Sequence, residues 1–452
     1  MGPMGHFERI QKLIIGLLLA YVAIAVALSY WGVVRGAALA ERQDNPRRVE
    51  AELRIWRGRI LDSEGQVLAE TTGPDAAPQR VYPLGSSGPA VGYYSFRFGT
   101  AGVEEGYDAV LRGDGNNVWE RFWRHNMHQA QQGRDIRLTL NGDRQRIAET
   151  LLGDRPGAVV LLTLPDGAIS AMASHPGYDP NRLDEEFEAL VSDPRAPLFN
   201  RATQGQYQPG LALQPFLLAG ALDDGVIALD DPVANADRAL QINGQTRTCT
   251  AEPPEDATWR DVLQNGCPYP MVGLADALSS DDVAAILSAF GFTEAPELPL
   301  AVAAPPELTL GNLPDALIGQ GELTVSPLQM ALALAALANE GALPAPRLVT
   351  AVQSETGEWQ SVPVDGEGRE AVSAAAASQI LRSLPQHDGT IVEFATQALA
   401  GPGGSSNAWY LGLAPAQRPR FAVVVVMEGA SGTTGAASTG RALLNAALTK
   451  SD

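Results

Sequence analysis

The chain has 452 residues, which is enough for two or three domains with a substantial buried core. Its composition is that of a globular protein and excludes a disordered or fibrous chain. The formal net charge of −20 at pH 7 argues against nucleic acid and anionic lipid headgroups as partners of the part outside a membrane.

Lysine occurs at only two positions, Lys12 and Lys450, so every basic residue between them is arginine or histidine. A guanidinium group stays protonated in proteins and cannot replace a lysine as a general base. Any mechanism that needs a lysine in an interior pocket is therefore excluded.

The first predicted element is an uncharged apolar run, residues 13–34, which is long enough to cross the roughly 30 Å hydrocarbon core of a bilayer. A cleaved signal peptide is the competing interpretation, because residues 38–40, Ala-Leu-Ala, have the pattern of a cleavage site. The run is longer than the apolar region of a usual signal peptide, so we expect an uncleaved anchor within residues 1–35. Basic residues flank the run on both sides and do not settle its orientation.

Strand and turn signals dominate the next hundred residues. Residues 57–69, Arg-Gly-Arg-Ile-Leu-Asp-Ser-Glu-Gly-Gln-Val-Leu-Ala, predict a strand, a turn and a second strand. Further turn and strand signals follow at residues 80–83, 91–95 and 102–113. We expect a small β-rich module that spans residues 36–134.

We expect a second domain from residue 135 to residue 452. It begins with a strand at 135–140 and a helix from about 143 to 152. Two apolar runs, 158–163 and 168–173, are joined by Leu-Pro-Asp-Gly and predict a hairpin.

Helical sequence dominates from residue 215 to residue 292. A later helix is predicted from its end signals, because Ser326 is a candidate N-cap, Pro327 suits the first helical position, and Gly341 follows the end. The last predicted elements are two paired strands and a closing helix, at residues 408–413, 421–426 and 440–448.

Residues 200–225 carry a family resemblance. They begin Asn-Arg-Ala-Thr-Gln-Gly-Gln-Tyr-Gln-Pro-Gly and continue as an apolar helical run from Leu211 to Leu222, which Gly225 ends. This segment resembles the nucleophile helix of penicillin-binding transpeptidases, in which Asn-Arg-Ala and Tyr-x-Pro-Gly lead into the Ser-x-x-Lys motif shared with serine β-lactamases.

Other segments resemble the same family in the same order. Residues 57–69 resemble the opening motif of class B penicillin-binding proteins, and residues 318–330 resemble a transpeptidase landmark that packs and positions. The resemblance implies an α+β fold, a transpeptidase or serine β-lactamase-like domain with an antiparallel sheet flanked by helices. A transmembrane helix and a small β-rich pedestal, of the short penicillin-binding protein A type, precede it.

The first catalytic motif of that family is lost. Carried over by position, its nucleophilic serine maps to Leu211 and its lysine base to Gln214. A leucine has no hydroxyl group, and a glutamine amide has no useful basicity. Thr203 is the only aliphatic hydroxyl close by, and without a base we expect no catalytic role for it.

The second motif, Ser-x-Asn, maps onto Gly266, Cys267 and Pro268, so both its hydroxyl and its amide are missing. Asn265, just before the motif, is in the wrong place to relay protons. No histidine is near Cys267 in the sequence, so we do not expect this thiol to act as a nucleophile.

The third motif, Lys-Thr-Gly on a strand, maps onto Pro402, Gly403 and Gly404. Proline removes both the charge of the lysine and one backbone donor. With the first two motifs lost as well, we expect no intact catalytic residue and no cofactor.

Cys249 and Cys267 lie 18 positions apart, and no Cys-x-x-Cys pattern or histidine cluster accompanies them, so we expect no metal site. They are either free thiols or a disulfide, and the oxidising exterior that the resemblance implies favours the disulfide. The resemblance also places His175 in a loop after a core strand, where we expect no catalytic role.

The resemblance implies a single-pass protein of the bacterial cell membrane with most of the chain outside the cytoplasm. We expect a catalytically inactive homologue that acts as a scaffold or regulator in peptidoglycan synthesis, with a polymerase or other cell-wall synthesis protein as its partner. Two alternatives stay open: an active D,D-transpeptidase with a relocated nucleophile, and a sensor that binds muropeptides or β-lactams reversibly. Binding of the peptidoglycan stem peptide also stays open.

Overall fold

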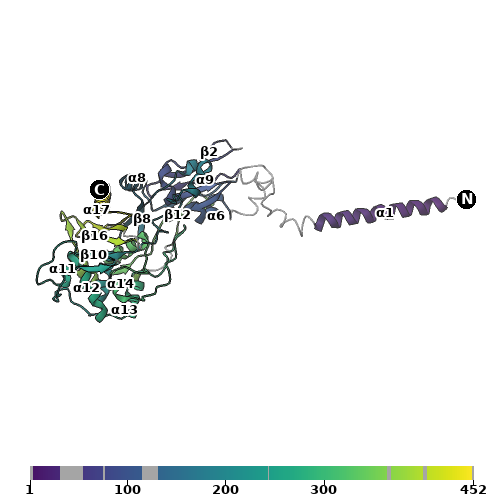
Figure 1. Ribbon diagram of the computed structural model, residues 1–452. Coiled ribbons are helices and arrows are strands. Elements are labelled where there is room, and N and C mark those ends of the chain that lie inside the picture. Colours follow the sequence, from purple (N-terminus) through teal and green to yellow (C-terminus); the bar gives the residue numbers. More distant parts are fainter. Residues whose placement is uncertain are drawn as a thin grey trace.

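An N-terminal helix, α1 (Met4–Ser29), stands apart from the body of the protein in this computed structural model (Figure 1). The stretch Gln11–Ser29 is long and apolar enough to cross a membrane, and none of it is buried in the body. The structure confirms the predicted apolar helix as far as Ser29. The described residues are 4–30, 54–74, 77–114, 131–242, 244–363, 368–400 and 405–449, so residues 31–34 of the predicted span lie outside them.

A six-stranded sheet in the N-terminal module takes its strands from three separate parts of the chain. The strand pair predicted within residues 57–69 is present as β1 (Ile60–Leu61) and β2 (Val67–Thr72). Strand β6 (Ile136–Leu138) pairs with β1 in parallel and with β12 (Val349–Gln353) in antiparallel orientation. The predicted domain boundary falls just before β6, so this sheet joins the two predicted domains. Its order is β13-β12-β6-β1-β2-β3, where β3 is Gln79–Val81 and β13 is Trp359–Ser361.

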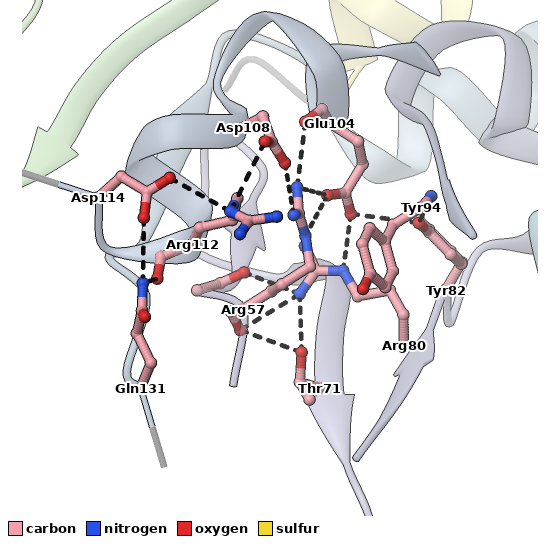
Figure 2. Close-up of polar contacts among 11 residues, drawn as sticks. Arg57, Thr71, Arg80, Tyr82, Tyr94, Glu104, Asp108, Arg112, Asp114 and Gln131 are labelled. Carbon is pink, nitrogen blue, oxygen red and sulfur yellow. Dashed lines mark hydrogen bonds and ion pairs between the residues drawn. The ribbon is translucent and has the colours of Figure 1, made fainter. Parts of the chain in front are cut away.

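A buried group of charged side chains fixes the rest of this module to the sheet (Figure 2). Glu104 is fully buried and accepts hydrogen bonds from Arg57 Nη2 at 2.8 Å and Arg80 Nε at 2.6 Å. Tyr82 donates to the same carboxylate at 3.2 Å, and Arg57 also pairs with Asp108 at 2.6 Å. A buried carboxylate needs such partners to remain charged. The short elements around the network are η2 (Gly85–Ser87), α4 (Gly88–Val91), β4 (Gly92–Ser95), β5 (Gly99–Gly102), α5 (Val103–Gly106) and α6 (Asp108–Arg112).

The second six-stranded sheet is antiparallel and separates two layers of helices. Its strand β18 (Phe421–Met427) is buried at every position, and successive side chains point to opposite faces. Val423 and Val425 pack with helices α8 (Gly142–Leu152) and α17 (Thr434–Thr449), whereas Val424 and Val426 join the larger core around α15 (Pro327–Ala338). The predicted antiparallel sheet flanked by helices is therefore confirmed. Its order is β15-β16-β17-β18-β7-β8, with β7 Gly157–Thr163, β8 Ala168–His175, β15 Gln386–His387, β16 Ile391–Leu399 and β17 Ser406–Ala414.

Helix α15 begins as its sequence predicts. The Ser326 hydroxyl accepts a hydrogen bond from Gln329 N at 3.1 Å, and Gln329 Oε1 accepts one from Ser326 N at 2.9 Å, which forms a capping box. Gly341 follows the helix with a φ of 85°. The other elements of this half of the chain are η3 (Pro180–Arg182), α9 (Leu183–Ser192), η4 (Gly210–Leu213), α10 (Gln214–Asp223), α11 (Trp259–Gln264), α12 (Pro268–Gly273), η5 (Leu274–Asp276), α13 (Ser280–Ala289), α14 (Leu313–Leu317), β11 (Ala342–Leu343), β14 (Arg369–Glu370) and α16 (Ala374–Ser383).

The structure corrects two predicted boundaries. The region predicted as mainly helical, 215–292, also contains a β-hairpin of β9 (Leu240–Ile242) and β10 (Gln245–Arg247). The closing helix begins at Thr434, earlier than predicted, and Gly440 lies inside it. A Cβ atom at Gly440 would lie 2.2 Å from the ring of Tyr410, so this glycine permits close packing and does not mark a helix start.

We expect Glu104→Gln to lower the free energy of unfolding at neutral pH by about 3–5 kcal/mol, because it breaks a buried ion-pair group. Burial raises the pKa of Glu104, but Arg80 and Arg57 more than offset this and hold the pKa below its ordinary value. Such a carboxylate stabilises the fold above its unfolded-state pKa of about 4.3, and the contribution disappears as the pH falls through the folded pKa. Urea unfolding at pH 7 and below pH 4 measures this loss.

Glu105→Gln is the matched control, because this neighbouring carboxylate is exposed. We expect it to change stability little at any pH. Equal effects of the two substitutions would contradict a stabilising role for the buried network.

Candidate functional site

The loop before the family's nucleophile helix is held against the end of the antiparallel sheet. Arg201 Nε donates to Glu428 Oε1 at 2.8 Å, and the Tyr207 hydroxyl donates to the same oxygen at 2.7 Å. Burial, together with the charge of Glu428, raises the pKa of Tyr207, so its hydroxyl stays a donor. Trp409 Nε1 donates to Gln208 O at 3.1 Å. These bonds fix the approach to residue 211.

Gly210 and Gly319 allow the turn that starts at residue 210 to lie close to the backbone around residue 319. Gly210 has a φ of 56° and donates its N–H to Gly319 O at 2.8 Å. A Cβ atom at Gly319 would lie 2.1 Å from Gly210 O, and one at Gly210 would lie 2.7 Å from Ala398 Cβ. The predicted helix from Leu211 therefore starts as the 3₁₀ turn η4 before α10 continues it. Leu211 is half-buried at this turn.

Gln214, at the position of the family's lysine, is completely buried. Its Nε2 lies 3.3 Å from both Val262 O and Cys267 O, so the amide links α10 to the segment of the second motif. Its Oε1 has no hydrogen-bond partner among the described residues. The amide can hold this junction together but cannot accept a proton from a hydroxyl group.

The second-motif segment is also held by a covalent bond. Cys249 and Cys267 form a disulfide, so neither sulfur is a free nucleophile. Gly266 has a φ of 57°, and Pro268 begins α12. Asn265 Nδ2 donates to Asp261 O at 2.8 Å, within the end of α11. This segment therefore closes one side of the site with backbone and a disulfide.

The strand that faces Leu211 is β16, which packs against η4. Pro402, Gly403 and Gly404 lie outside the described residues, between β16 and β17. The strand residues that share a pocket with Leu211 belong to β16 and are Ala395, Thr396, Gln397 and Leu399. This edge of the sheet carries hydroxyl and amide groups and no cation.

A pocket of about 430 Å³ lies between η4, β16 and the β9–β10 hairpin. Leu211 and Pro268 line it, together with Gln320, whose side chain is 5% exposed and whose Oε1 has no partner among the described residues. Arg247 lines the pocket from β10, and its Nη2 donates to Ser406 Oγ at 3.0 Å. Six threonines complete its polar lining: Thr246, Thr248, Thr250, Thr396, Thr433 and Thr434.

The pocket has the groups that bind a polar ligand but lacks those that move a proton. Its lining residues include no lysine, histidine, aspartate or glutamate in the described part of the chain. Threonine hydroxyls and the Arg247 guanidinium can donate hydrogen bonds, and Gln320 Oε1 can accept one. None of these groups can activate a hydroxyl nucleophile.

Arg247 and Gln320 were not predicted as site residues. The local signal for Arg247 was weak, because it stands in a Thr-Arg-Thr-Cys run within a region predicted to be helical. The expected disulfide was the available signal, since pairing Cys249 with Cys267 brings this run against the second motif.

Two other candidates from the sequence lie elsewhere. Thr203 is buried and donates its hydroxyl to Ala301 O at 2.8 Å. His175 ends β8 and is not among the pocket-lining residues, and burial lowers its pKa. Neither residue shares the pocket with Leu211.

Known proteins share this architecture. Residues 157–448 match the family described as "Penicillin binding protein transpeptidase domain", and residues 57–136 match "Penicillin binding protein A dimerisation domain". The peptidoglycan D,D-transpeptidase PbpA of Mycolicibacterium smegmatis is 29% identical, over 97% of this chain and 98% of its own length.

Solved structures agree with this match. Penicillin-binding protein A from M. tuberculosis, as an imipenem acyl-enzyme complex, has a TM-score of 0.79 at 27% identity and covers 88% of this chain and 100% of that chain. The D,D-transpeptidase domain of a peptidoglycan glycosyltransferase from Eggerthella lenta has a TM-score of 0.76 at 25% identity, with 88% and 99% covered. The chain therefore belongs to the penicillin-binding protein transpeptidase family, and within it to the class B proteins.

We expect Cys249→Ser/Cys267→Ser to lower the free energy of unfolding by about 3 kcal/mol, because the disulfide closes a loop between residues 18 positions apart. Urea unfolding under oxidising conditions measures the loss. The parent protein treated with reductant is the control and should show the same loss. A parent protein whose unfolding and gel mobility do not respond to reductant would contradict the disulfide.

Proposed function

We propose that this chain is a catalytically inactive class B homologue that acts as a scaffold or regulator in peptidoglycan synthesis. The observation that carries the proposal is the pair Leu211 and Gln214. The family's nucleophile position holds an alkyl side chain, and its base position holds an amide that is hydrogen-bonded to two backbone carbonyls. Its relatives are named peptidoglycan D,D-transpeptidases, which gives the cell wall as the setting.

Acyl transfer needs more than a pocket of the right shape. The nucleophile must lose a proton to a nearby base, and general-base help alone contributes about 10²–10⁴-fold in rate. Lys12 lies in α1, Lys450 lies beside the C-terminus, and no other lysine exists in the chain. A relocated lysine therefore does not replace the one that Gln214 displaced.

The same proposal includes the arrangement of the chain at the membrane. A single anchor within residues 1–35 would hold a pedestal, residues 36–134, and a transpeptidase-like domain, residues 135–452, outside the cytoplasm. Helix α1 supports the anchor by its length and composition. Partners would be polymerases or other cell-wall synthesis proteins that bind the anchor and the pedestal.

We expect the full-length protein to show no covalent labelling by a fluorescent penicillin after denaturing electrophoresis. Leu211→Ser should stay unlabelled as well, because a hydroxyl without a base is not activated. Penicillin-binding protein A from M. tuberculosis, whose structure as a penicillin G acyl-enzyme complex is solved, is the positive control. A heat-stable band on the parent protein would favour the alternative of an active enzyme with a relocated nucleophile.

Reversible ligand binding is the second candidate function, and the polar pocket favours it. Arg247 is the one cation among the described lining residues, and no carboxylate among them opposes it. A guanidinium group binds carboxylates well. A muropeptide or β-lactam could therefore be sensed here without being consumed.

We expect a carboxylate-bearing muropeptide or penicillin to raise the melting temperature of the parent protein, and Arg247→Gln to abolish that rise. Arg238→Gln is the matched control, because this exposed arginine lies outside the pocket and bonds to Tyr269. Differential scanning fluorimetry with and without ligand measures the shift. No shift in the parent protein, or an equal loss in both variants, would contradict this function.

A further inference from the structure

Helix α9 carries an apolar stripe that the described part of the chain covers at only one end. Leu183, Phe187, Leu190 and Val191 have the i, i+4, i+7, i+8 spacing of a single helix face. Leu183 is buried, Phe187 and Leu190 are half-buried, and Val191 is 62% exposed. The stripe therefore runs from the core out to the surface.

The β4–β5 hairpin widens this apolar stripe. Phe98 stacks on Phe187 with ring centroids 3.8 Å apart and an interplanar angle of 12°, and Phe96 beside it is 45% exposed. Beyond residue 30, four large apolar side chains are exposed among the described residues: Phe96, Val191, Phe199 and Trp359. The first three come from this hairpin, from α9 and from the loop after α9. We call Phe96, Phe98, Phe187, Leu190 and Val191 the α9 surface.

Acidic side chains border the α9 surface. Residues 182–195 contain five carboxylates and two arginines, and each arginine is paired inside the segment, Arg182 with Glu186 and Arg195 with Asp193. The three remaining carboxylates, Asp184, Glu185 and Glu188, are exposed, and they outnumber Arg97, whose guanidinium lies 5.0 Å from the centroid of the Phe98 ring. The border of the α9 surface is therefore acidic on balance. Aromatic anchors inside a charged rim are typical of protein–protein contact sites.

The negative charge around the α9 surface determines which kind of partner fits it. A two-fold contact with a second copy would bring two surfaces with the same excess of negative charge together, which is unfavourable. Anionic lipid headgroups would be repelled for the same reason. A protein segment with basic residues around an apolar centre complements both the stripe and its rim.

The position of the α9 surface indicates where such a partner lies. Helix α9 packs on β4, and Figure 1 shows it at the end of the body that faces α1, with α11, α12 and α13 at the far end. We propose that the α9 surface docks a basic, apolar-centred segment of another protein near the membrane. This docking does not depend on the state of the pocket around Leu211.

Site-specific photo-crosslinking of the full-length protein in the membranes of its host tests the proposal. A photoreactive residue replaces Val191 or, in a second variant, Phe96, and the cross-linked peptide is identified by mass spectrometry. Trp359 is the matched control position, because it is also exposed but lies on β13. We expect adducts from the first two positions and none from Trp359, with the adducts mapping to a segment of another protein that has more basic than acidic residues.

A charge reversal tests the rim. Glu185→Lys/Glu188→Lys should lower the Val191 adduct several-fold without changing the melting temperature, whereas Glu252→Lys/Glu255→Lys, the same charge change at other exposed positions, should not. The proposal is overturned by the absence of an adduct, or by an adduct to lipid, to a second copy, to residues 115–130 of the chain itself or to an acidic segment. An equal loss in both charge reversals would also overturn it.

Discussion

The buried amide of Gln214 is the contact on which the candidate site depends. It joins the first helix of the site to two carbonyl groups around the second motif, while the disulfide joins that motif to the β9–β10 hairpin. In this family a lysine stands at the position of Gln214 and takes a proton. Here the side chain at this position is an amide that hydrogen-bonds to two backbone carbonyls and so holds two segments of the site together.

Other residues around the pocket also contribute packing or structural bonds at positions near the family's motifs. Leu211 contributes apolar surface, Cys267 is consumed in a disulfide, and the facing strand supplies Thr396 and Gln397. The remaining polarity comes from Arg247, Gln320 and threonines, which bind ligands well and catalyse poorly. This lining supports the proposal that the site recognises a ligand and does not react with it.

The sequence predicted those parts of the fold that depend on local patterns. The capping residues of α15, the buried valines of β18 and the turn between β7 and β8 are all short-range signals, and each led to the correct element. Contacts between distant residues left no such signal. The pairing of β6 with β12 and the position of Arg247 follow from tertiary packing and from one disulfide. The closing helix was predicted to start at residue 440, but Gly440 lies inside it, where the missing side chain permits close packing against Tyr410.

The N-terminal half has a different physical character. Its buried group around Glu104 ties short elements into one module, and helix α9, which packs on β4 of that module, adds a surface with an acidic rim. Neither feature involves the pocket. The proposed docking of a partner therefore rests on groups that are separate from the pocket.

The most direct test of the central claim is the intact mass of the full-length protein after prolonged exposure to a β-lactam at saturating concentration. The account predicts a mass unchanged from that of the untreated chain, because the described residues that line the pocket include no base beside a hydroxyl group. A mass increase equal to one β-lactam, mapped to any side chain of the pocket, would contradict it.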